Sequence, residues 1–221
     1  MPQQISKAQK APIDFDSRHA VLETASSEGQ VWVDFLRGDD QAVARLYSLY
    51  ANKLFNYGHH FTKNDDLILD AVQDVFLNLI RTRNKLSVAT SVKFYLYSSF
   101  RRTLVRQVKR SNKIVLQDDM DSENFQITLD PNYLSVNTNY SGDQKRIIER
   151  FCNKLPTRQR EAIVLHYFED LNYAEIAKTM NFINSKSART LVYRALDSLS
   201  KLISTWKKEL IVTVSILSFL S

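Results

Sequence analysis

Apolar side chains recur at steps of three and four residues along most of the chain, which is the spacing of amphipathic helices. Such patterns begin after Asp39-Asp40, after Asn64-Asp65-Asp66 and near Thr90-Ser91, and residues of these types favour helix starts. Four further helical patterns crowd into residues 144–205. No repeat of roughly 20–50 residues is visible. The pattern therefore predicts an all-α fold.

The composition agrees with long helices. Of the 221 residues only four are Gly and four are Pro, whereas folds with many tight turns need more of both. The single cysteine, Cys152, excludes a disulfide framework and fits a reducing compartment. Residues 1–30 contain acids and no apolar run, so no secretory signal is predicted. We therefore expect a cytoplasmic protein.

Changes in composition divide the chain into segments. Residues 1–27 are predicted to be a mobile tail and residues 28–112 a helical domain. Residues 113–143 carry many acids and few large apolar side chains, which predicts an acidic, flexible linker. Residues 144–205 form a second helical domain, and residues 206–221 are an apolar extension.

The apolar extension contains an eleven-residue run from Leu210 to Leu220. A helix that spans a bilayer needs about 20 such residues, so no stable membrane insertion is expected. Three interpretations stay open. The run extends the last helix and packs on the second domain, it forms a surface for a partner, or it associates shallowly with a membrane.

The third helical pattern combines aromatic and basic residues without an acid among them. Its aromatic side chains lie in the first half and its positive charges in the second: Phe94, Tyr95, Tyr97, Arg101, Arg102, Arg106, Lys109 and Arg110. Basic groups neutralise phosphates, and aromatic faces stack on unpaired bases. The combination suits a duplex that is being opened. The alternative is that the aromatics belong to the core and the charges to a solvated face.

The second domain has the pattern of a helix-turn-helix. Asn172 and Glu175 have the spacing of a capping box, and Asn181 stands where the chain must turn in the left-handed conformation. The next helix begins after Asn184. Its open faces carry Ser185, Lys186, Ser187, Arg189, Thr190, Tyr193 and Arg194. The first residues of such a helix reach base edges in the major groove. Helical hairpins that bind no DNA share this pattern, so both alternatives stay open.

Together these segments resemble one family. The motifs are D-x-x-Q-x-x-F at Asp70–Phe76, L-P-x-R-Q-R-E at Leu155–Glu161 and N-Y-A-E-I-A at Asn172–Ala177. The chain resembles bacterial RNA polymerase sigma factors of the extracytoplasmic-function (ECF) type, within the sigma-70 family. The resemblance covers residues 31–110 and 144–203. One departure is Asn181, which stands where the family normally has Gly.

The resemblance implies a region 2-like bundle of about three or four helices, a region 4-like helix-turn-helix domain, and no catalysis, cofactor or metal. It implies a subunit that binds core RNA polymerase and directs promoter recognition, DNA melting and transcription initiation. The residues of this subunit that would dock on the β′ clamp of the polymerase are Asp70, Gln73, Asp74, Phe76 and Asn78.

The same resemblance assigns roles to the remaining segments. Arg101, Arg102 and Arg106 would hold the backbone of the opened strand, and the second domain would contact the upstream promoter element and the β flap. An anti-sigma factor is expected as a further partner. The alternative is a stand-alone helix-turn-helix regulator that acts without docking on the polymerase clamp.

Enzyme and metal chemistry are not predicted. Asp65-Asp66 and Asp70 loosely resemble an acidic magnesium motif, but the spacing is one residue too long and no second motif occurs. His59 and His60 are adjacent, so on a helix they point apart and cannot share a metal ion.

Overall fold

The computed structural model describes residues 28–88, 91–111, 125–128 and 142–220. Of residues 142–145 and 207–220 it describes only the backbone. Residues 28–37 are helical, and the elements that follow are α2 (Asp40–Gly58), α3 (Asp65–Thr82), the 3₁₀ turn η1 (Arg83–Lys85), α4 (Val92–Ser111), α5 (Gly142–Cys152), α6 (Thr157–Ile163), the π-helical turn η2 (Val164–Phe168), α7 (Tyr173–Thr179) and α8 (Ser185–Leu220). Within these ranges there is no strand, which confirms the all-α prediction.

The helix starts lie where the sequence predicts them. The carboxylate of Asp39 accepts a hydrogen bond from the Gln41 amide at 2.8 Å and caps α2. The Asn64 side chain accepts from the Leu67 amide at 3.2 Å and caps α3. These side chains satisfy amide groups that have no partner within the helix. The starts are therefore set by local sequence.

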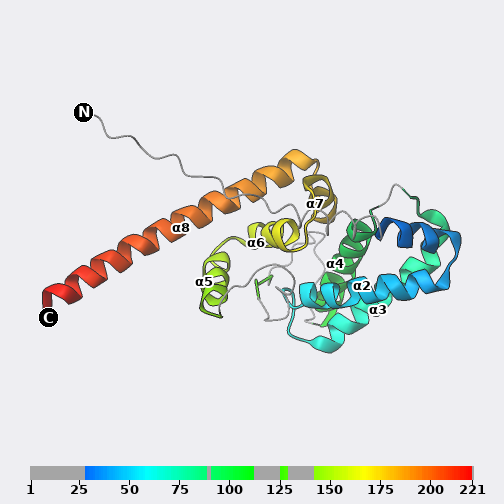
Figure 1. Cartoon of the computed structure of the whole chain (residues 1–221), viewed down its shortest axis with the longest axis horizontal. Helices are drawn as coiled ribbons and strands as arrows, with labels where there is room; N and C mark the ends of the chain where they lie inside the picture. The colour runs from blue at the N-terminus through cyan, green and yellow to red at the C-terminus, as the bar shows by residue number, and fades with distance from the viewer. Residues whose placement is uncertain (1–27, 89–90, 112–124, 129–141, 221) are drawn as a thin grey trace.

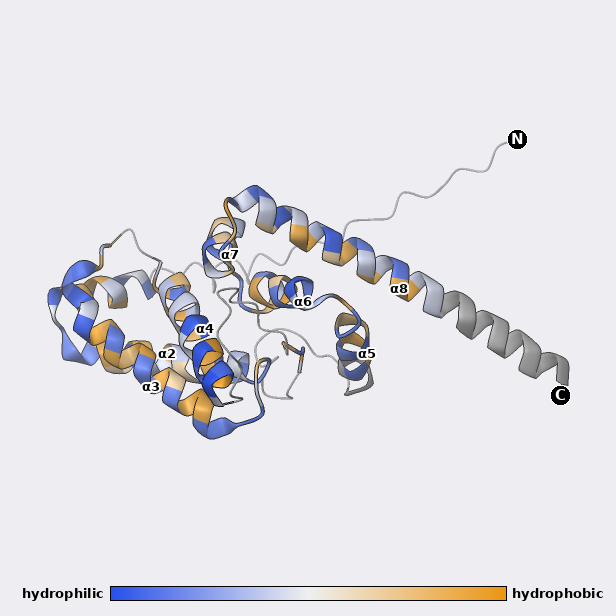
Figure 2. Ribbon diagram, turned by 180° about the vertical axis from the view of Figure 1, so that it is seen from behind, coloured by the Kyte–Doolittle hydropathy of each residue, from blue (hydrophilic) through white to orange (hydrophobic). Residues whose placement is uncertain are grey.

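The first helical unit (residues 28–111) is a bundle in which α2, α3 and α4 lie together (Figure 1). Figure 2 shows hydrophobic and hydrophilic residues alternating along these helices, as amphipathic helices require. Gly58, at the end of α2, lets this helix approach α3 and α4 closely. A Cβ there would lie 2.5 Å from the Ile68 side chain and 3.1 Å from the Phe100 ring. Glycine at this position is therefore required for α2 to meet α3 and α4.

The second helical unit (residues 142–206) places α6 and α7 against the long helix α8 (Figure 1). The turn between α7 and α8 is closed by Asn181, whose φ is +56°. The Phe182 amide donates to the Ala177 carbonyl at 2.7 Å, and the Asn181 amide to the Lys178 carbonyl at 3.4 Å. This pair of bonds forms a Schellman motif. It confirms the left-handed conformation predicted for Asn181.

The short described part of the linker is packed against both units. Phe125 and Ile127 are buried in the hydrophobic core. The Gln126 amide donates to the His60 carbonyl at 2.7 Å, while the Asn153 side chain makes two hydrogen bonds to the Ile127 backbone, at 2.8 and 2.9 Å. Residues 125–128 therefore bridge the end of α2 and the end of α5. Residues 142–143 of the predicted linker belong to α5, whereas its residues 113–124 and 129–141 and the predicted tail 1–27 lie outside the described residues.

The C-terminal extension continues α8, whose backbone is helical through Leu220. The interpretation that the apolar run Leu210–Leu220 extends the last helix is confirmed for the backbone. The predicted packing of this extension on the second domain depends on the side chains of residues 207–220, which lie outside the described part of the structure. Among the described residues, no helix is both long and apolar enough to cross a membrane.

His60 gives the linker contact a dependence on pH. Its Nδ1 lies 3.0 Å from the Gln126 carbonyl and 3.2 Å from the Thr128 amide. Burial lowers the pKa of His60 from its ordinary 6.5 to about 4; the Gln126 hydrogen bond opposes this shift and the neighbouring His59 adds to it. The folded chain therefore holds a neutral imidazole, whereas the unfolded chain protonates it below about pH 6.5.

Because the unfolded state binds the extra proton, this contribution to stability is complete above pH 6.5 and is lost as the pH falls towards 4. We expect the free energy of unfolding to fall by about 2 kcal/mol more in the wild type than in His60→Asn between about pH 7.5 and pH 5. Urea unfolding followed by circular dichroism measures this difference. Parallel pH profiles for the two proteins would contradict the prediction.

Candidate polymerase and nucleic-acid interfaces

The outer face of α3 carries polar and apolar side chains together. Asp70 and Gln73 are exposed, as the sequence predicts for a docking surface. Beside them lie Leu69, Leu77 and Ile80, which are 44%, 49% and 43% exposed. Clustered exposed apolar side chains mark an interaction surface, so α3 presents one.

The three other predicted docking residues contact α2 or α4: Asp74 and Asn78 are exposed and make hydrogen bonds to α4, and Phe76 is buried. Asp74 accepts a hydrogen bond from the Gln107 side chain of α4 at 3.1 Å, and Asn78 donates to the Tyr95 hydroxyl at 3.3 Å. Phe76 is buried, with its ring edge-on to Tyr47 at 5.0 Å between centroids. These residues fix α3 against its neighbours and so hold the outer face in position.

The exposed face of α4 is a stripe of positive charge. Arg102, Arg106 and Arg110 are exposed and follow one another at four-residue steps, which places them on one side of the helix. Lys109 is half-buried beside them. A straight row of guanidinium groups can follow the phosphates of one strand. The predicted role of these residues is therefore compatible with their positions.

A neighbouring face of α4 lies against the second helical unit. Arg101 is 2% exposed, and its Nε and Nη2 both donate to the Glu161 carboxylate of α6, the latter at 3.0 Å. The buried Tyr97 hydroxyl donates to Glu169, which follows η2. Arg101 and Tyr97 were predicted to contact DNA, but in this arrangement both are covered. We call this set of contacts, together with Tyr57, the inter-unit contact.

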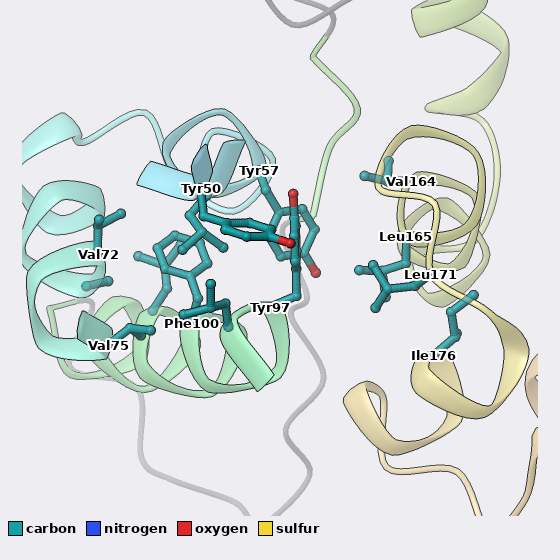
Figure 3. Close-up of a cluster of buried hydrophobic side chains, with 14 of the residues drawn as sticks. Tyr50, Tyr57, Val72, Val75, Tyr97, Phe100, Val164, Leu165, Leu171 and Ile176 are labelled. Atoms are coloured by element: carbon teal, nitrogen blue, oxygen red, sulfur yellow. The ribbon is translucent and has the colours of Figure 1, made fainter. Parts of the chain in front are cut away.

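Tyr57 of α2 completes the inter-unit contact, since its hydroxyl donates to Glu161 at 3.3 Å. Burial, and then the Glu161 charge, hold the pKa of Tyr57 well above its usual value, so the hydroxyl stays a donor. Figure 3 shows Leu165 and Leu171 of the second unit pointing toward Tyr57 and Tyr97. One hydrophobic core therefore extends through both units.

Weaker contacts surround the inter-unit contact. Lys93 of α4 lies 3.7 Å from the exposed Asp170 carboxylate, and the Lys178 ammonium lies 5.6 Å from the centre of the Phe94 ring. Tyr95 faces the other way, because its hydroxyl lies 3.0 Å from the Thr82 hydroxyl of α3. Of the three aromatic residues predicted to meet DNA, two thus face the second unit and one faces α3.

The first turns of α8 carry the residues predicted for base contacts. Six of the seven are exposed: Ser185, Lys186, Arg189, Thr190, Tyr193 and Arg194. Ser187 is half-buried; its amide donates to the Asn184 side chain at 3.0 Å and its hydroxyl lies 3.2 Å from the same oxygen. Ser187 therefore helps to start the helix. The Arg189 guanidinium lies 5.4 Å from the centre of the Tyr193 ring.

The preceding helix α7 is fixed by the predicted capping box. The Asn172 side chain accepts from the Glu175 amide at 3.0 Å, and the Glu175 carboxylate accepts from the Asn172 amide at 2.9 Å. At the other end of α7, Arg158 of α6 donates to the Met180 carbonyl at 3.0 Å and lies over the Phe182 ring. Both ends of α7 are therefore held, which sets the angle at which α8 leaves the turn.

Comparison with known proteins decides the family. Residues 46–114 match the model of Sigma-70 region 2, and residues 145–199 match that of Sigma-70, region 4. The chain is an ECF sigma factor of the sigma-70 family. It directs transcription initiation, binds core RNA polymerase and promoter DNA, and belongs to a non-enzymatic family. The predicted family and function are confirmed.

Curated relatives match about 72% of the chain. The ECF RNA polymerase sigma factor SigM of Bacillus subtilis is 24% identical over 161 residues, which cover 72% of this chain and 94% of SigM. The ECF RNA polymerase sigma-E factor of Haemophilus influenzae is 26% identical over 164 residues, covering 72% and 86%. A solved structure of CnrH in complex with the cytosolic domain of CnrY has 16% identity and a TM-score of 0.54, and covers 80% of this chain and 97% of that one.

In this sigma factor, α2 from Leu46 onward, α3 and α4 belong to region 2, and α5 to α7 with the first part of α8 belong to region 4. The inter-unit contact therefore joins region 2 to region 4. Sequence reasoning missed Glu161 and Glu169 as its partners. The sequence carries a signal for both residues. Glu161 lies within the apolar pattern of α6 and Glu169 directly follows that of η2, where exposed acids are not expected.

The capping box should support region 4 measurably. Replacement of Asn172 by Ala removes acceptors for the Ala174 and Glu175 amides, at a cost of about 1 kcal/mol in the free energy of unfolding. Replacement of the exposed Asn52 by Ala, in the interior of α2, is the matched control and should leave stability within about 0.5 kcal/mol. Denaturant unfolding measures both variants; equal values for the two would show that the cap does not stabilise α7.

Proposed function

We propose that the outer face of α3 is the surface by which this sigma factor docks on the β′ clamp of core RNA polymerase. The observation that carries the proposal is the exposed set of Leu69, Leu77 and Ile80 around Asp70 and Gln73. Apolar side chains supply binding free energy, and the polar pair supplies orientation. Asp74, Phe76 and Asn78 act indirectly, by holding α3 against α2 and α4.

We further propose that α4 holds the opened promoter strand. The support is the exposed row of Arg102, Arg106 and Arg110, with the half-buried Lys109 beside it. Phe94 and Tyr95, near the start of the helix, are proposed to supply the aromatic faces after they leave their contacts with Lys178 and Thr82. Guanidinium groups hold phosphates, and aromatic rings hold unpaired bases. Arg101 and Tyr97 join this surface only when the inter-unit contact is broken.

The upstream promoter element is proposed to meet the start of α8. Arg189 is the best candidate for a base contact, since it is exposed in the second turn and carries a guanidinium group. Lys186, Thr190 and Arg194 would contact phosphates or neighbouring bases, and Tyr193 would support Arg189. Ser185 lies at the first residue of the helix, and Ser187 acts through the helix start.

The partners are proposed in finer detail from the family. Region 4 would contact the β flap. The two domains would comprise residues 28–112 and 144–205. The chain would work in the cytoplasm, where RNA polymerase is found. A second protein is proposed to regulate it, in line with the solved complex of CnrH with the cytosolic domain of CnrY. We propose an anti-sigma factor in that role.

The docking face is tested by one polar side chain. Replacement of Gln73 by Ala should weaken binding to core RNA polymerase about tenfold, since the loss of one well-placed polar contact in an interface costs roughly 1.4 kcal/mol. The matched control is Gln41→Ala, because Gln41 is also exposed but lies at the start of α2. Fluorescence titration of labelled core polymerase measures the two affinities. Equal affinities would contradict the α3 assignment.

The strand-opening role is tested on the exposed arginines. Arg102→Ala combined with Arg106→Ala should slow promoter opening by about tenfold or more, because each charged contact contributes on the order of 1 kcal/mol. Closed-complex formation should change little. Permanganate footprinting on the reconstituted holoenzyme measures opening. Arg37→Ala with Arg45→Ala removes the same charge elsewhere in the first helical unit and should open normally. Slowing by both pairs would indicate a general charge effect.

A further inference from the structure

Three tyrosines from three elements converge beside Arg189, the residue proposed to contact a base. Tyr167 lies in η2, Tyr173 is the first residue of α7, and Tyr193 lies in α8. Tyr167 and Tyr193 are 55% and 51% exposed, whereas Tyr173 is half-buried against the hydrophobic core. Figure 1 shows α7 beside the first turns of α8, and Tyr173 interacts there with Tyr193 and Arg189.

Both the ring and the backbone of Tyr173 are fixed by neighbouring residues. The His166 ring is stacked on the Tyr173 ring, with 4.6 Å between the centroids and 29° between the planes. The Nδ1 atom of His166 lies 3.0 Å from the Leu171 carbonyl, which orients the imidazole. The Asn172 side chain caps α7 immediately before Tyr173. The Tyr173 hydroxyl is therefore presented in a defined position.

The Tyr173 hydroxyl connects α7 to α8. It forms a hydrogen bond with Tyr193, and burial, followed by the neighbouring phenols, raises the pKa of Tyr173. The Arg189 guanidinium lies 5.4 Å from the centre of the Tyr193 ring. A guanidinium group is attracted to the negative face of a tyrosine ring. A continuous set of contacts thus runs across η2, α7 and α8, and we call its members the positioning network: His166, Tyr173, Tyr193 and Arg189.

The positioning network limits the freedom of an exposed arginine. An arginine side chain has many rotamers, and a two-bond contact with the edge of one base uses few of them. Tyr193 alone is a weak support, because it is itself half exposed. Its hydrogen bond to Tyr173 restrains it, so Arg189 loses less conformational entropy when it binds a base. This advantage is realised with the base whose edge matches the held position, and therefore it raises discrimination between bases more than overall affinity.

We propose that Tyr173 is a positioning residue for promoter specificity: through its hydrogen bond to Tyr193 it holds the Arg189 guanidinium in the orientation that reads one base pair of the upstream element. Tyr173 acts in this way without touching DNA. The inference rests on the proposed base contact of Arg189 and adds the residues that orient it. Tyr173 acts on Tyr193 directly, and His166 acts by fixing the Tyr173 ring.

The test uses the full-length chain bound to core RNA polymerase and a set of duplex DNAs. Each duplex carries the upstream element of a promoter that the holoenzyme transcribes, with one base pair replaced. Competition binding followed by fluorescence anisotropy then gives the discrimination at each position. Arg189→Ala identifies the base pair that Arg189 reads, as the position at which discrimination is lost.

Tyr173→Phe keeps the ring that stacks on His166 and removes only the hydroxyl. It should lower discrimination about threefold at the base pair identified by Arg189→Ala, because one hydrogen bond that orients the arginine is lost. Discrimination at the other positions of the upstream element should stay unchanged.

Further variants test the hydrogen bond itself. Tyr193→Phe removes the other hydroxyl and keeps the ring beside Arg189, so it should have the same effect as Tyr173→Phe. The two substitutions together should lower discrimination no further than either alone, since the bond is already lost. The matched control is Tyr167→Phe, which removes the hydroxyl of the third tyrosine, whose ring lies edge-on to His166. This control should discriminate like the wild type.

The outcomes are distinct. A loss of discrimination confined to the base pair of Arg189, in Tyr173→Phe and not in Tyr167→Phe, supports the positioning role. If Arg189→Ala loses discrimination at no position, it is the proposed base contact that fails. If Arg189→Ala loses it and Tyr173→Phe keeps it, the positioning role is overturned. Equal weakening of every duplex by Tyr173→Phe, as loss of a phosphate contact would give, overturns it as well. Should Tyr173→Phe not fold, Tyr193→Phe decides in the same way.

Discussion

The arrangement of this sigma factor depends on one buried ion pair between Arg101 of α4 and Glu161 of α6. Removal of one partner from such a pair leaves a charge without hydration and costs about 3–5 kcal/mol. The other polar groups of the inter-unit contact depend on the same approach of α6 to α4. The hydroxyl of Tyr57 meets the Glu161 carboxylate only when that approach is made. Burial of Leu165 and Leu171 against the first unit then adds apolar area.

Much of the fold could be predicted because its signals are local. A helix start is decided by one side chain and the next three amides, so Asp39, Asn64 and Asn172 were sufficient to place α2, α3 and α7. The left-handed turn at Asn181 is likewise a property of one residue. Family motifs then connected these elements to region 2 and region 4, as the comparisons confirm.

The candidate site could be predicted only in part, because burial depends on residues far away in sequence. Arg101 and Arg102 are adjacent and chemically identical, yet one is 2% exposed and the other exposed, since successive residues of a helix point about 100° apart. Only the position of Glu161, which lies sixty residues further along the chain, decides which arginine is buried. Phe125 similarly belongs to a segment whose composition predicts a flexible linker, and its burial depends on the rings of Tyr57, His60 and Phe61 at the end of α2.

The electrostatic design of region 2 follows from these two environments of arginine. An exposed guanidinium contributes to binding in proportion to the phosphates it neutralises, and its contribution falls as salt rises. A buried guanidinium is screened far less, so the Arg101–Glu161 pair keeps its strength at salt concentrations that weaken the exposed stripe.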